Sequence, residues 1–270
     1  MILLFVACML PQGDLDTGTS AQWSGLSVKG ESACAFSPDG ELTCWGQAAE
    51  YSASLAVREI ALGNNHSCGL NVDGRVHCAG NDSYGETEPP TTAMSQVVVG
   101  DYQSCGLDLQ GEVHCWGWGR IAIELPPGPY TRLSMSGYQL CGLDLQGQIR
   151  CAGSLSTCGD GVPPEGQYVA MDQSGCHGCA LDEQGIVTCW NATPDLVPPG
   201  NGWLEIAAGD GFTCALDNAD DVYCFGPAAP EPLIEHPIHE LDAGSQHLLC
   251  GLDSDGMLCW GQGAVDAGMP

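Results

Sequence analysis

Basic residues are scarce in this chain of 270 residues. Six Lys and Arg stand against 34 Asp and Glu, which gives a formal net charge of −28 at pH 7. Because nucleic acids and anionic membranes are bound through clusters of Lys and Arg, this balance argues against both kinds of partner. It suits a basic protein partner or cations, although the same charge also serves solubility alone.

Long apolar runs and helical patterns are also missing. No stretch of about 18 or more consecutive apolar residues occurs, so the sequence contains no candidate membrane-spanning helix. Apolar residues alternate with a period of two along short segments, and 38 glycines and 17 prolines supply turns between them. The sequence therefore predicts an all-β chain that is rich in turns.

What the sequence does contain is one short segment written seven times. CGLDLQG occurs at residues 105–111 and again, letter for letter, at 141–147. The aligned copies begin at cysteines that are 34 to 38 residues apart, namely Cys34, Cys68, Cys105, Cys141, Cys179, Cys214 and Cys250. A period of about 36 residues indicates repeated supersecondary units.

Each copy has the pattern of a β-hairpin that a disulfide can close. In the first copy, a turn at Ser37–Gly40 separates two short segments, and pairing Phe36 with Leu42 places Cys34 opposite Cys44. Directly opposed cysteines in an antiparallel pair lie within disulfide range. The predicted bridges are Cys34–Cys44, Cys68–Cys78, Cys105–Cys115, Cys141–Cys151, Cys179–Cys189, Cys214–Cys224 and Cys250–Cys259, the last of which closes a hairpin shorter by one residue.

Three of the 17 cysteines remain outside these hairpins, namely Cys8, Cys158 and Cys176. We expect Cys158 to pair with Cys176, because Cys179 already has Cys189 opposite it. Cysteines in such number and at such regular spacing are typical of disulfides formed in an oxidising compartment. Buried free thiols are the alternative.

An apolar segment that ends in a small residue precedes most of the hairpins, as in REIALG at 58–63 and SQVVVG at 95–100. Each unit then has three to four short antiparallel strands. Such units cannot bury a face alone, whereas a closed ring shares one core and leaves only short edges. We predict a seven-bladed β-propeller over residues 21–270, in which an N-terminal strand completes the sheet that the C-terminal end leaves unfinished.

Two segments carry a resemblance to a known family. GNNHSCGLNVDGRVHCAGN at 63–81 and GDYQSCGLDLQGEVHCWGWG at 100–119 resemble the repeat of the regulator of chromosome condensation family, and the likeness extends over about residues 21–270. It implies a seven-bladed propeller. The family's propellers include a nuclear nucleotide-exchange factor, secreted β-lactamase inhibitory proteins of type II and bacterial surface proteins. Seven disulfides and scarce basic charge depart from the nuclear member, so the chain is similar to the secreted, cysteine-paired bacterial branch.

Residues 1–20 look like an export segment and tether. Phe5–Cys8 resembles a bacterial lipobox, in which Cys8 would receive a lipid, although no Lys or Arg precedes the short apolar run. An ordinary secretion signal and a stretch without such meaning are the alternatives. We expect a secreted or cell-surface protein, an outer-membrane lipoprotein among the possibilities, that touches a membrane only through a lipid anchor.

The residues just before each first cysteine differ between copies, and in a propeller these turns share one face. Because aromatic residues dominate interface energetics, we expect this face to contact a protein partner. The expected contact residues are Asn65, His66, Tyr102, Tyr138, His177, Phe212 and His247. The alternative is that the aromatic ones pack between blades.

No catalytic residue, cofactor or metal site is predicted. His236 and His239 lie close to Glu235 and Glu240 but lack a third ligand. The predicted function is an exported, surface-anchored propeller that binds an extracellular or envelope protein as a monomer. An extracellular lyase or hydrolase with its site at the channel mouth, and a structural envelope component, are the alternatives. Polar residues converging on that mouth would favour the enzyme, and a face ringed by aromatics would favour binding.

Overall fold

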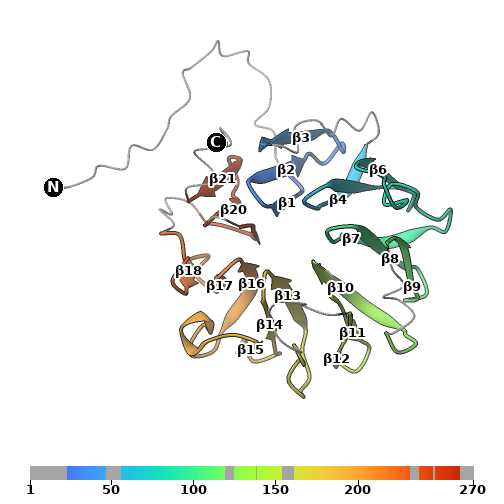
Figure 1. The fold of residues 1–270 in the computed structure, drawn as a ribbon. Coiled ribbons are helices and arrows are strands. Elements are labelled where there is room, and N and C mark those ends of the chain that lie inside the picture. Colours follow the sequence, from blue (N-terminus) through green and yellow to red (C-terminus); the bar gives the residue numbers. More distant parts are fainter. Residues whose placement is uncertain are drawn as a thin grey trace, which may run out of the picture.

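The computed structural model describes residues 23–46, 56–118, 125–137, 139–153, 161–231, 237–245 and 247–261. These residues form seven antiparallel sheets that are arranged around a central channel (Figure 1). Each sheet comes from one copy of the repeat and has three strands in chain order. The prediction of an all-β, seven-bladed propeller is therefore confirmed, with three strands in each blade.

The strands fall into three sets of equivalent position. The inner strands, which line the channel, are β1 (Gly25–Lys29), β4 (Val57–Leu62), β7 (Met94–Val99), β10 (Tyr130–Ser136), β13 (Ala170–Ser174), β16 (Trp203–Gly209) and β19 (Glu240–Ala243). The middle strands are β2 (Ser32–Phe36), β5 (His66–Asn71), β8 (Gln103–Asp108), β11 (Gln139–Asp144), β14 (His177–Leu181), β17 (Phe212–Asp217) and β20 (Leu249–Leu252). The outer strands are β3 (Leu42–Trp45), β6 (Val76–Gly80), β9 (Val113–Gly117), β12 (Ile149–Gly153), β15 (Val187–Trp190), β18 (Val222–Phe225) and β21 (Met257–Trp260).

A short 3₁₀ turn, η2, spans Pro194–Leu196 between the fifth and sixth blades. No helix that the described residues form has the length and the apolar character needed to span a membrane.

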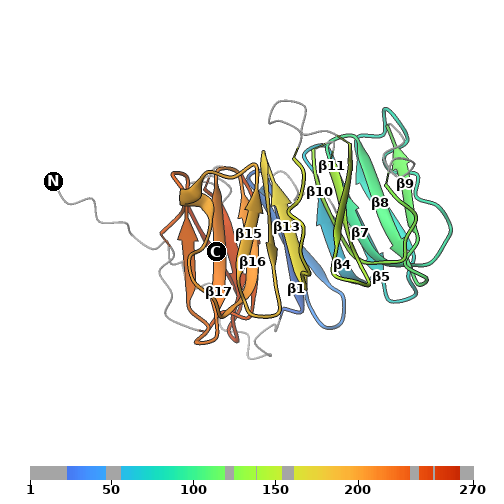
Figure 2. The ribbon, with the colours of Figure 1, turned by 90° about the horizontal axis from the view of Figure 1, so that it is seen from below.

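The two kinds of turn lie at opposite ends of the blades. Because neighbouring strands in each sheet are antiparallel, the turn from inner to middle strand is at one end and the turn from middle to outer strand is at the other. The side view shows strands running between two faces of the ring (Figure 2). We call these the first-turn face and the hairpin-turn face. The described contact residues expected from the sequence belong to the first-turn face, namely Asn65, His66, Tyr102, His177, Phe212 and His247.

The ring closes differently from the sequence prediction. Among the described residues, the last sheet consists of β19, β20 and β21, and β1 pairs with β2 inside the first sheet. The prediction that an N-terminal strand completes the last sheet is therefore wrong for β1, the first described strand. Instead, β1 lies beside β19 (Figure 1). The backbone N–H groups of Leu26 and Val28 donate to Glu240 Oε1 at 3.3 Å and to Asp242 Oδ2 at 2.6 Å. Side-chain hydrogen bonds across the blade boundary thus replace a shared strand.

The hairpins have the predicted register. Phe36 pairs with Leu42 and Cys34 with Cys44. The cysteine pairs are equivalent in the other blades, and all seven predicted bridges are present with Cα–Cα distances of 4.0–4.1 Å. The prediction of one hairpin disulfide in each blade is confirmed. Cys176 is also disulfide-bonded, but Cys158 lies outside the described residues, so that pairing stays a prediction.

The hydrophobic core lies in the layers between adjacent blades. Leu26 and Val28 of the first blade pack with Leu248 and Met257 of the last, and each neighbouring pair of blades forms a similar cluster. The first cysteine of every hairpin is fully buried in these layers. The bridges therefore fix the sheets at the places where apolar burial stabilises the ring.

The sixth hairpin offers a test of turn chemistry. Five hairpins have a glycine with φ between +72° and +82° at the turn position that Asp220 occupies in the sixth, with φ 63°. A side chain in this left-handed region costs about 1 kcal/mol, whereas glycine adopts it without strain. We expect Asp220→Gly to raise the free energy of unfolding by roughly 0.5 kcal/mol, measured by urea denaturation. Gly74→Asp in the second hairpin is the reverse control and should lower it; the opposite signs would contradict this account.

Candidate functional site

The structure separates the residues expected to contact a partner into two groups. Asn65 and His247 are exposed and Tyr102 is partly exposed, whereas His66, His177 and Phe212 are 4%, 3% and 0% exposed. Tyr138 lies outside the described residues. The middle strand begins at His66, at His177 and at Phe212, and the side chain at this position points toward the next blade. His66 Nε2 and His177 Nε2 accordingly lie 2.7 and 2.9 Å from Ser104 Oγ and Thr213 Oγ1.

Direct contact of a partner with these three side chains is therefore an incorrect expectation. For them, packing between blades, the alternative considered from the sequence, is the correct one.

A cluster of three aromatic residues occupies the first-turn face between the second and third blades. Tyr84 follows β6, Tyr102 lies in the turn between β7 and β8, and Trp118 follows β9. The ring centroids of Tyr84 and Tyr102 are 5.8 Å apart at an interplanar angle of 88°, and those of Tyr84 and Trp118 are 6.4 Å apart at 56°. Tyr84 is 55% exposed and Trp118 is 51% exposed. We call these three residues the aromatic patch.

Sequence reasoning found Tyr102 but missed the other two members of the patch. Trp118 stands in the segment WGWG, directly after the last residue of β9, and the outer strand ends on the same face as the first turn. Its backbone N–H donates to Tyr102 O at 2.8 Å, which ties the two segments together. The signal was therefore the position of Trp118 at the end of a strand, which places it on this face.

A buried carboxylate lies next to the patch. The side chain of Glu86 is fully buried, and its Oε2 accepts a hydrogen bond from the backbone N–H of Tyr84 at 2.6 Å. Its backbone oxygen accepts a bond from Trp116 Nε1 at 2.8 Å. Its second oxygen, Oε1, has no hydrogen-bond partner among the described residues. A carboxylate oxygen left without a partner costs stability, which makes this position a candidate for a functional role.

Two more unpartnered polar atoms belong to the same boundary between blades. His66 Nδ1 and Gln103 Nε2 are buried without a hydrogen-bond partner among the residues that the structure describes. Burial lowers the pKa of His66, and the negative charges of Glu86, Asp101 and Asp82 oppose that effect. Aromatic exposure and unsatisfied polar groups thus coincide at one place in the fold.

The charged residues near the patch are acidic. Asp82 and Glu88 flank Tyr84 in the same loop, and Asp101 precedes Tyr102 and accepts a hydrogen bond from Asn64 Nδ2 at 2.8 Å. The five basic residues that the structure describes lie elsewhere: Lys29 and Arg132 in the channel, and Arg58, Arg75 and Arg150 toward the hairpin-turn face. Arg120 lies outside the described residues.

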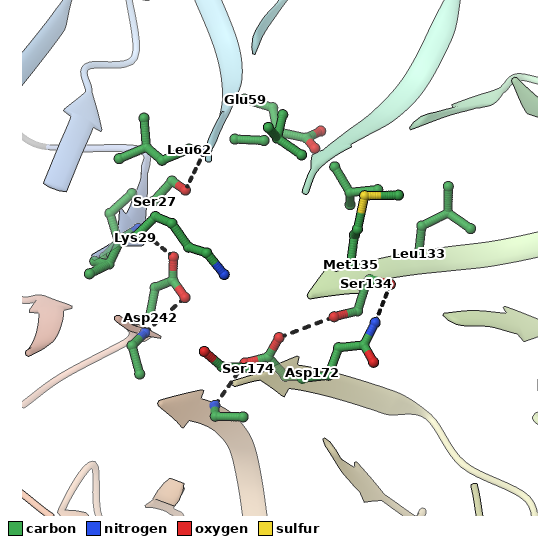
Figure 3. Close-up of a pocket in the computed structure, with 18 of the residues that line it drawn as sticks. Ser27, Lys29, Glu59, Leu62, Leu133, Ser134, Met135, Asp172, Ser174 and Asp242 are labelled. Atoms are coloured by element: carbon green, nitrogen blue, oxygen red, sulfur yellow. Dashed lines mark hydrogen bonds between the residues drawn. The ribbon is translucent and has the colours of Figure 1, made fainter. Parts of the chain in front are cut away.

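The central channel forms a second polar site. It encloses a cavity of about 340 Å³ that is lined by side chains from all seven inner strands. Glu59, Asp172, Glu205, Glu240 and Asp242 supply carboxyl groups, and Lys29 extends into the cavity (Figure 3). Within the described part of the chain, no carboxylate lies at ion-pair distance from Lys29 or Arg132.

Most of the polar side chains around the channel act as clamps between blades. An inner strand has no neighbouring strand on one side, so some of its N–H groups need another acceptor. Glu59 Oε1 accepts from Val97 N at 3.0 Å, Gln96 Oε1 from Leu133 N at 2.7 Å, and Glu205 Oε1 from Leu241 N at 3.1 Å. Four more side chains accept backbone N–H groups in the same way: Ser27 from Leu62, Asp172 from Ala208, Glu240 from Leu26 and Asp242 from Val28. Each clamp reaches from one blade to the next.

The clamp carboxyls are harder to ionise than ordinary ones. Burial raises the pKa of Glu59 and of Glu205 to about 7 and that of Asp242 to about 8, and the charge of Asp172 adds to the effect on Asp242. Burial also raises the pKa of Asp172 and of Glu240. The bonds from backbone N–H groups act in the opposite direction, because they favour the charged form. Near neutral pH Glu59, Glu205 and Asp242 can therefore both hold and release protons.

No metal centre is visible in the described ranges, where no group of three His, Cys, Asp or Glu side chains is placed to hold an ion. His236, half of the histidine pair noted in the sequence, lies outside those ranges.

The seven sheets and their bridged hairpins define the class of the protein as a seven-bladed β-propeller. It carries repeats of the regulator of chromosome condensation type: the family described as "Regulator of chromosome condensation (RCC1) repeat" matches residues 57–86 and 94–120. These are the second and third blades, which also build the aromatic patch. No curated protein matches the chain in sequence.

Several solved structures are similar in fold. The ectodomain of the receptor kinase CR4 from Physcomitrella patens has a TM-score of 0.73 and 23% identity, and the match covers 87% of this chain and 72% of that one. The CRINKLY WD40 ectodomain of the receptor kinase ACR4 from Arabidopsis thaliana has a TM-score of 0.71 and 23% identity, over 88% and 94%. Prp20p from Saccharomyces cerevisiae has a TM-score of 0.65 and 12% identity, over 87% and 82%. At these identities the likeness establishes the fold.

Proposed function

We propose that this propeller is an extracellular protein-binding module that contacts its partner, as a monomer, through the first-turn face. The observation that carries the proposal is the aromatic patch. Tyr and Trp are enriched among the residues that dominate binding energy, and here they are held on turns and strand ends of a rigid ring. A partner that covers Tyr84 and Trp118 would bury aromatic surface that now faces solvent.

Charge favours a basic partner. The net charge of −28 speeds the approach of a cationic protein over long distances, and Asp82, Glu88 and Asp101 surround the patch at short range. Among the solved structures that are similar in fold, that of Prp20p is described with its binding to Gsp1p and histones. That description supports protein binding as a use of the fold and identifies no partner for this chain.

Extracellular placement is supported by the disulfides. Seven hairpin bridges are present, and such bridges persist in oxidising compartments. The two receptor-kinase structures are described as ectodomains, which agrees with the same placement. Export through residues 1–20 and lipid attachment at Cys8 lie outside the described residues and stay predictions.

The test is capture of a partner followed by measurement with the purified pair. The oxidised chain is immobilised and exposed to extracellular and envelope extracts, and the captured protein is identified and purified. We expect Tyr84→Ala/Trp118→Ala to weaken its binding about tenfold or more, because truncating central aromatic contacts removes a large share of binding energy.

The matched control removes apolar surface from the opposite face. Leu109 and Leu145 are 68% and 63% exposed in hairpin turns, so Leu109→Ala/Leu145→Ala should leave the affinity unchanged. Both variants should keep the wild-type melting temperature. Equal binding by all three proteins, or loss only in the Leu variant, would count against the first-turn face.

The channel supports a second candidate function, an extracellular enzyme such as a lyase or hydrolase. The observation that favours it is the set of carboxyls with raised pKa around a cavity, since such groups can exchange protons near neutral pH. It ranks second because these carboxyls already accept hydrogen bonds from the backbone and hold the blades together. Turnover of an extracellular polysaccharide by wild type, and its loss in Glu205→Gln, would favour the enzyme.

A further inference from the structure

We propose that the aromatic patch recognises a Lys or Arg side chain of the partner, with Glu86 as the buried counter-charge. This inference rests on the proposed function, because it names the chemical group that the first-turn face would bind. It assigns separate roles to the rings and to the carboxylate. The rings provide the contact surface, and the carboxylate makes that surface attractive to a cation.

The arrangement of the rings suits a cation. The face of an aromatic ring carries partial negative charge, and an ammonium or guanidinium group is attracted when it lies within about 6 Å of the ring centre. Tyr84 stands nearly perpendicular to Tyr102 and is tilted against Trp118, so the three rings are not stacked on one another. More than half of the surface of Tyr84 and of Trp118 faces solvent. A side chain of a partner can therefore approach ring surface from outside.

Glu86, which is buried beneath the exposed rings, strengthens this attraction through its negative charge. Its Oε2 is bonded to the backbone N–H of Tyr84, which fixes the carboxylate directly beside the patch. A Cβ atom added to Gly117, the residue before Trp118, would lie 3.3 Å from Glu86 Cγ. The carboxylate thus lies close to two of the three segments that supply rings. Because it is buried, its charge is screened less by water and salt than the charges of surface acids.

The unpaired oxygen of Glu86 indicates that the negative charge at this position serves binding and not the stability of the fold. A buried carboxylate with an unpartnered oxygen lowers stability; an apolar residue would avoid that cost, and a glutamine would lessen it by removing the charge. The hydrogen bond that holds the backbone at this position is donated by Tyr84 N–H, and the amide oxygen of a glutamine could accept it as well. A cation above the rings would offset the remaining charge in the complex.

The surroundings of the patch favour a cation over an apolar group. Asp82, Glu88 and Asp101 are the charged neighbours among the described residues, and none of the five described basic residues lies beside them. The most exposed aliphatic side chains in hairpin turns, Val72, Leu109 and Leu145, lie on the opposite face. Docking of an apolar partner surface would remove water from the acids around the patch without giving them a partner, which costs free energy.

The experiment uses short peptides as probes on the full oxidised chain. An alternating Lys-Gly peptide and the matched Glu-Gly peptide are titrated by calorimetry at low and at moderate ionic strength. We expect the Lys-Gly peptide to bind and the Glu-Gly peptide not to bind. Trp118→Leu and Tyr84→Leu keep apolar area but remove the ring charge distribution, and each should weaken binding of the Lys-Gly peptide roughly two- to fivefold.

Glu86→Gln is the variant that isolates the buried charge. It keeps the side-chain shape and an acceptor for Tyr84 N, so the melting temperature should be kept or raised while affinity for the Lys-Gly peptide falls. Asp82→Asn/Glu88→Gln should lower the affinity mainly at low salt, because exposed charges are screened. Should Glu86→Gln fail to fold, the salt dependence of the Leu variants still tests the rings: loss that persists at moderate salt indicates cation–ring contact.

The outcomes separate this inference from the proposed function. If the captured protein partner is lost with Trp118→Ala but retained with Trp118→Leu, and the Lys-Gly peptide does not bind, the face is a binding surface but the recognised group is apolar. That result overturns the inference and leaves the proposed function standing. Retention of the partner by both Trp118 variants overturns both.

Discussion

Complete reduction of the hairpin disulfides should unfold the propeller at room temperature. Each bridge closes a loop of 9 or 10 residues in sequence separation, for which the chain-entropy relation gives about 2.7 kcal/mol. The seven bridges together contribute more than the net stability of about 5–15 kcal/mol that is usual for a folded domain. The expected result is loss of the β-sheet circular dichroism signal after reduction, with thiol counting to show that reduction is complete.

A single-bridge variant calibrates this result. Cys105→Ser/Cys115→Ser removes one bridge from the third blade, and we expect it to fold with a free energy of unfolding lower by about 2–3 kcal/mol. The buried position of Cys105 adds the cost of a hydroxyl in an apolar layer. A fully reduced chain that keeps its sheet signal and its cooperative melting would show that packing between blades is sufficient without the bridges.

The repeat determined most of what could be predicted of the fold. Turn residues at fixed offsets and two cysteines in each copy specify the register of the hairpins, since both are local in sequence. The pairing of Cys34 with Cys44 was therefore predictable from the turn alone. Ring closure was not, because the hydrogen bonds from Leu26 and Val28 to Glu240 and Asp242 join residues that are 214 positions apart. No local pattern distinguishes a clamp from an exposed acid.

The candidate site shows the same limit. Tyr102 was predicted because it lies in the turn before a cysteine, whereas Tyr84 lies in a loop whose path depends on how the second and third blades pack. His66, His177 and Phe212 share the sequence position that suggested exposure, but the strand turns them toward the neighbouring blade. Position relative to the cysteine specifies the face of the ring, and tertiary packing decides whether the side chain is buried.

The propeller should be more stable in mild acid than at slightly alkaline pH. Burial raises the folded-state pKa of Glu59 and Glu205 to about 7 and that of Asp242 to about 8. A carboxyl whose pKa is raised on folding stabilises the folded state fully below its unfolded pKa, near 4, and this contribution is lost as the pH rises through the folded value. We expect the free energy of unfolding to fall between about pH 4 and pH 8, measured by urea denaturation.

The magnitude is limited by water in the channel. The clamp carboxyls are only partly buried by surface area, so we expect on the order of 1 kcal/mol from each rather than the full value of the pKa shift. His66 and His177 contribute with the opposite sign, because burial lowers their pKa and their stabilisation is lost as the pH falls below about 6.5. A comparison between variants is therefore needed to isolate the carboxyls.

The third blade supplies that comparison, because it carries an amide, Gln96, at the position where the second and sixth blades carry Glu59 and Glu205. Gln96 Oε1 accepts from Leu133 N, and its Nε2 donates to Leu133 O at 3.0 Å. Glu59→Gln/Glu205→Gln should therefore keep the clamps and reduce the loss of stability between about pH 4 and pH 8 by about 2 kcal/mol. Gln96→Glu is the reverse exchange: its protonated acid can make both bonds to Leu133, its ionised form can make only one, and the loss of stability should grow. Unfolding curves with the same pH dependence in all three proteins would place the titrating groups elsewhere, whereas opposite changes in the two variants would assign them to the clamps.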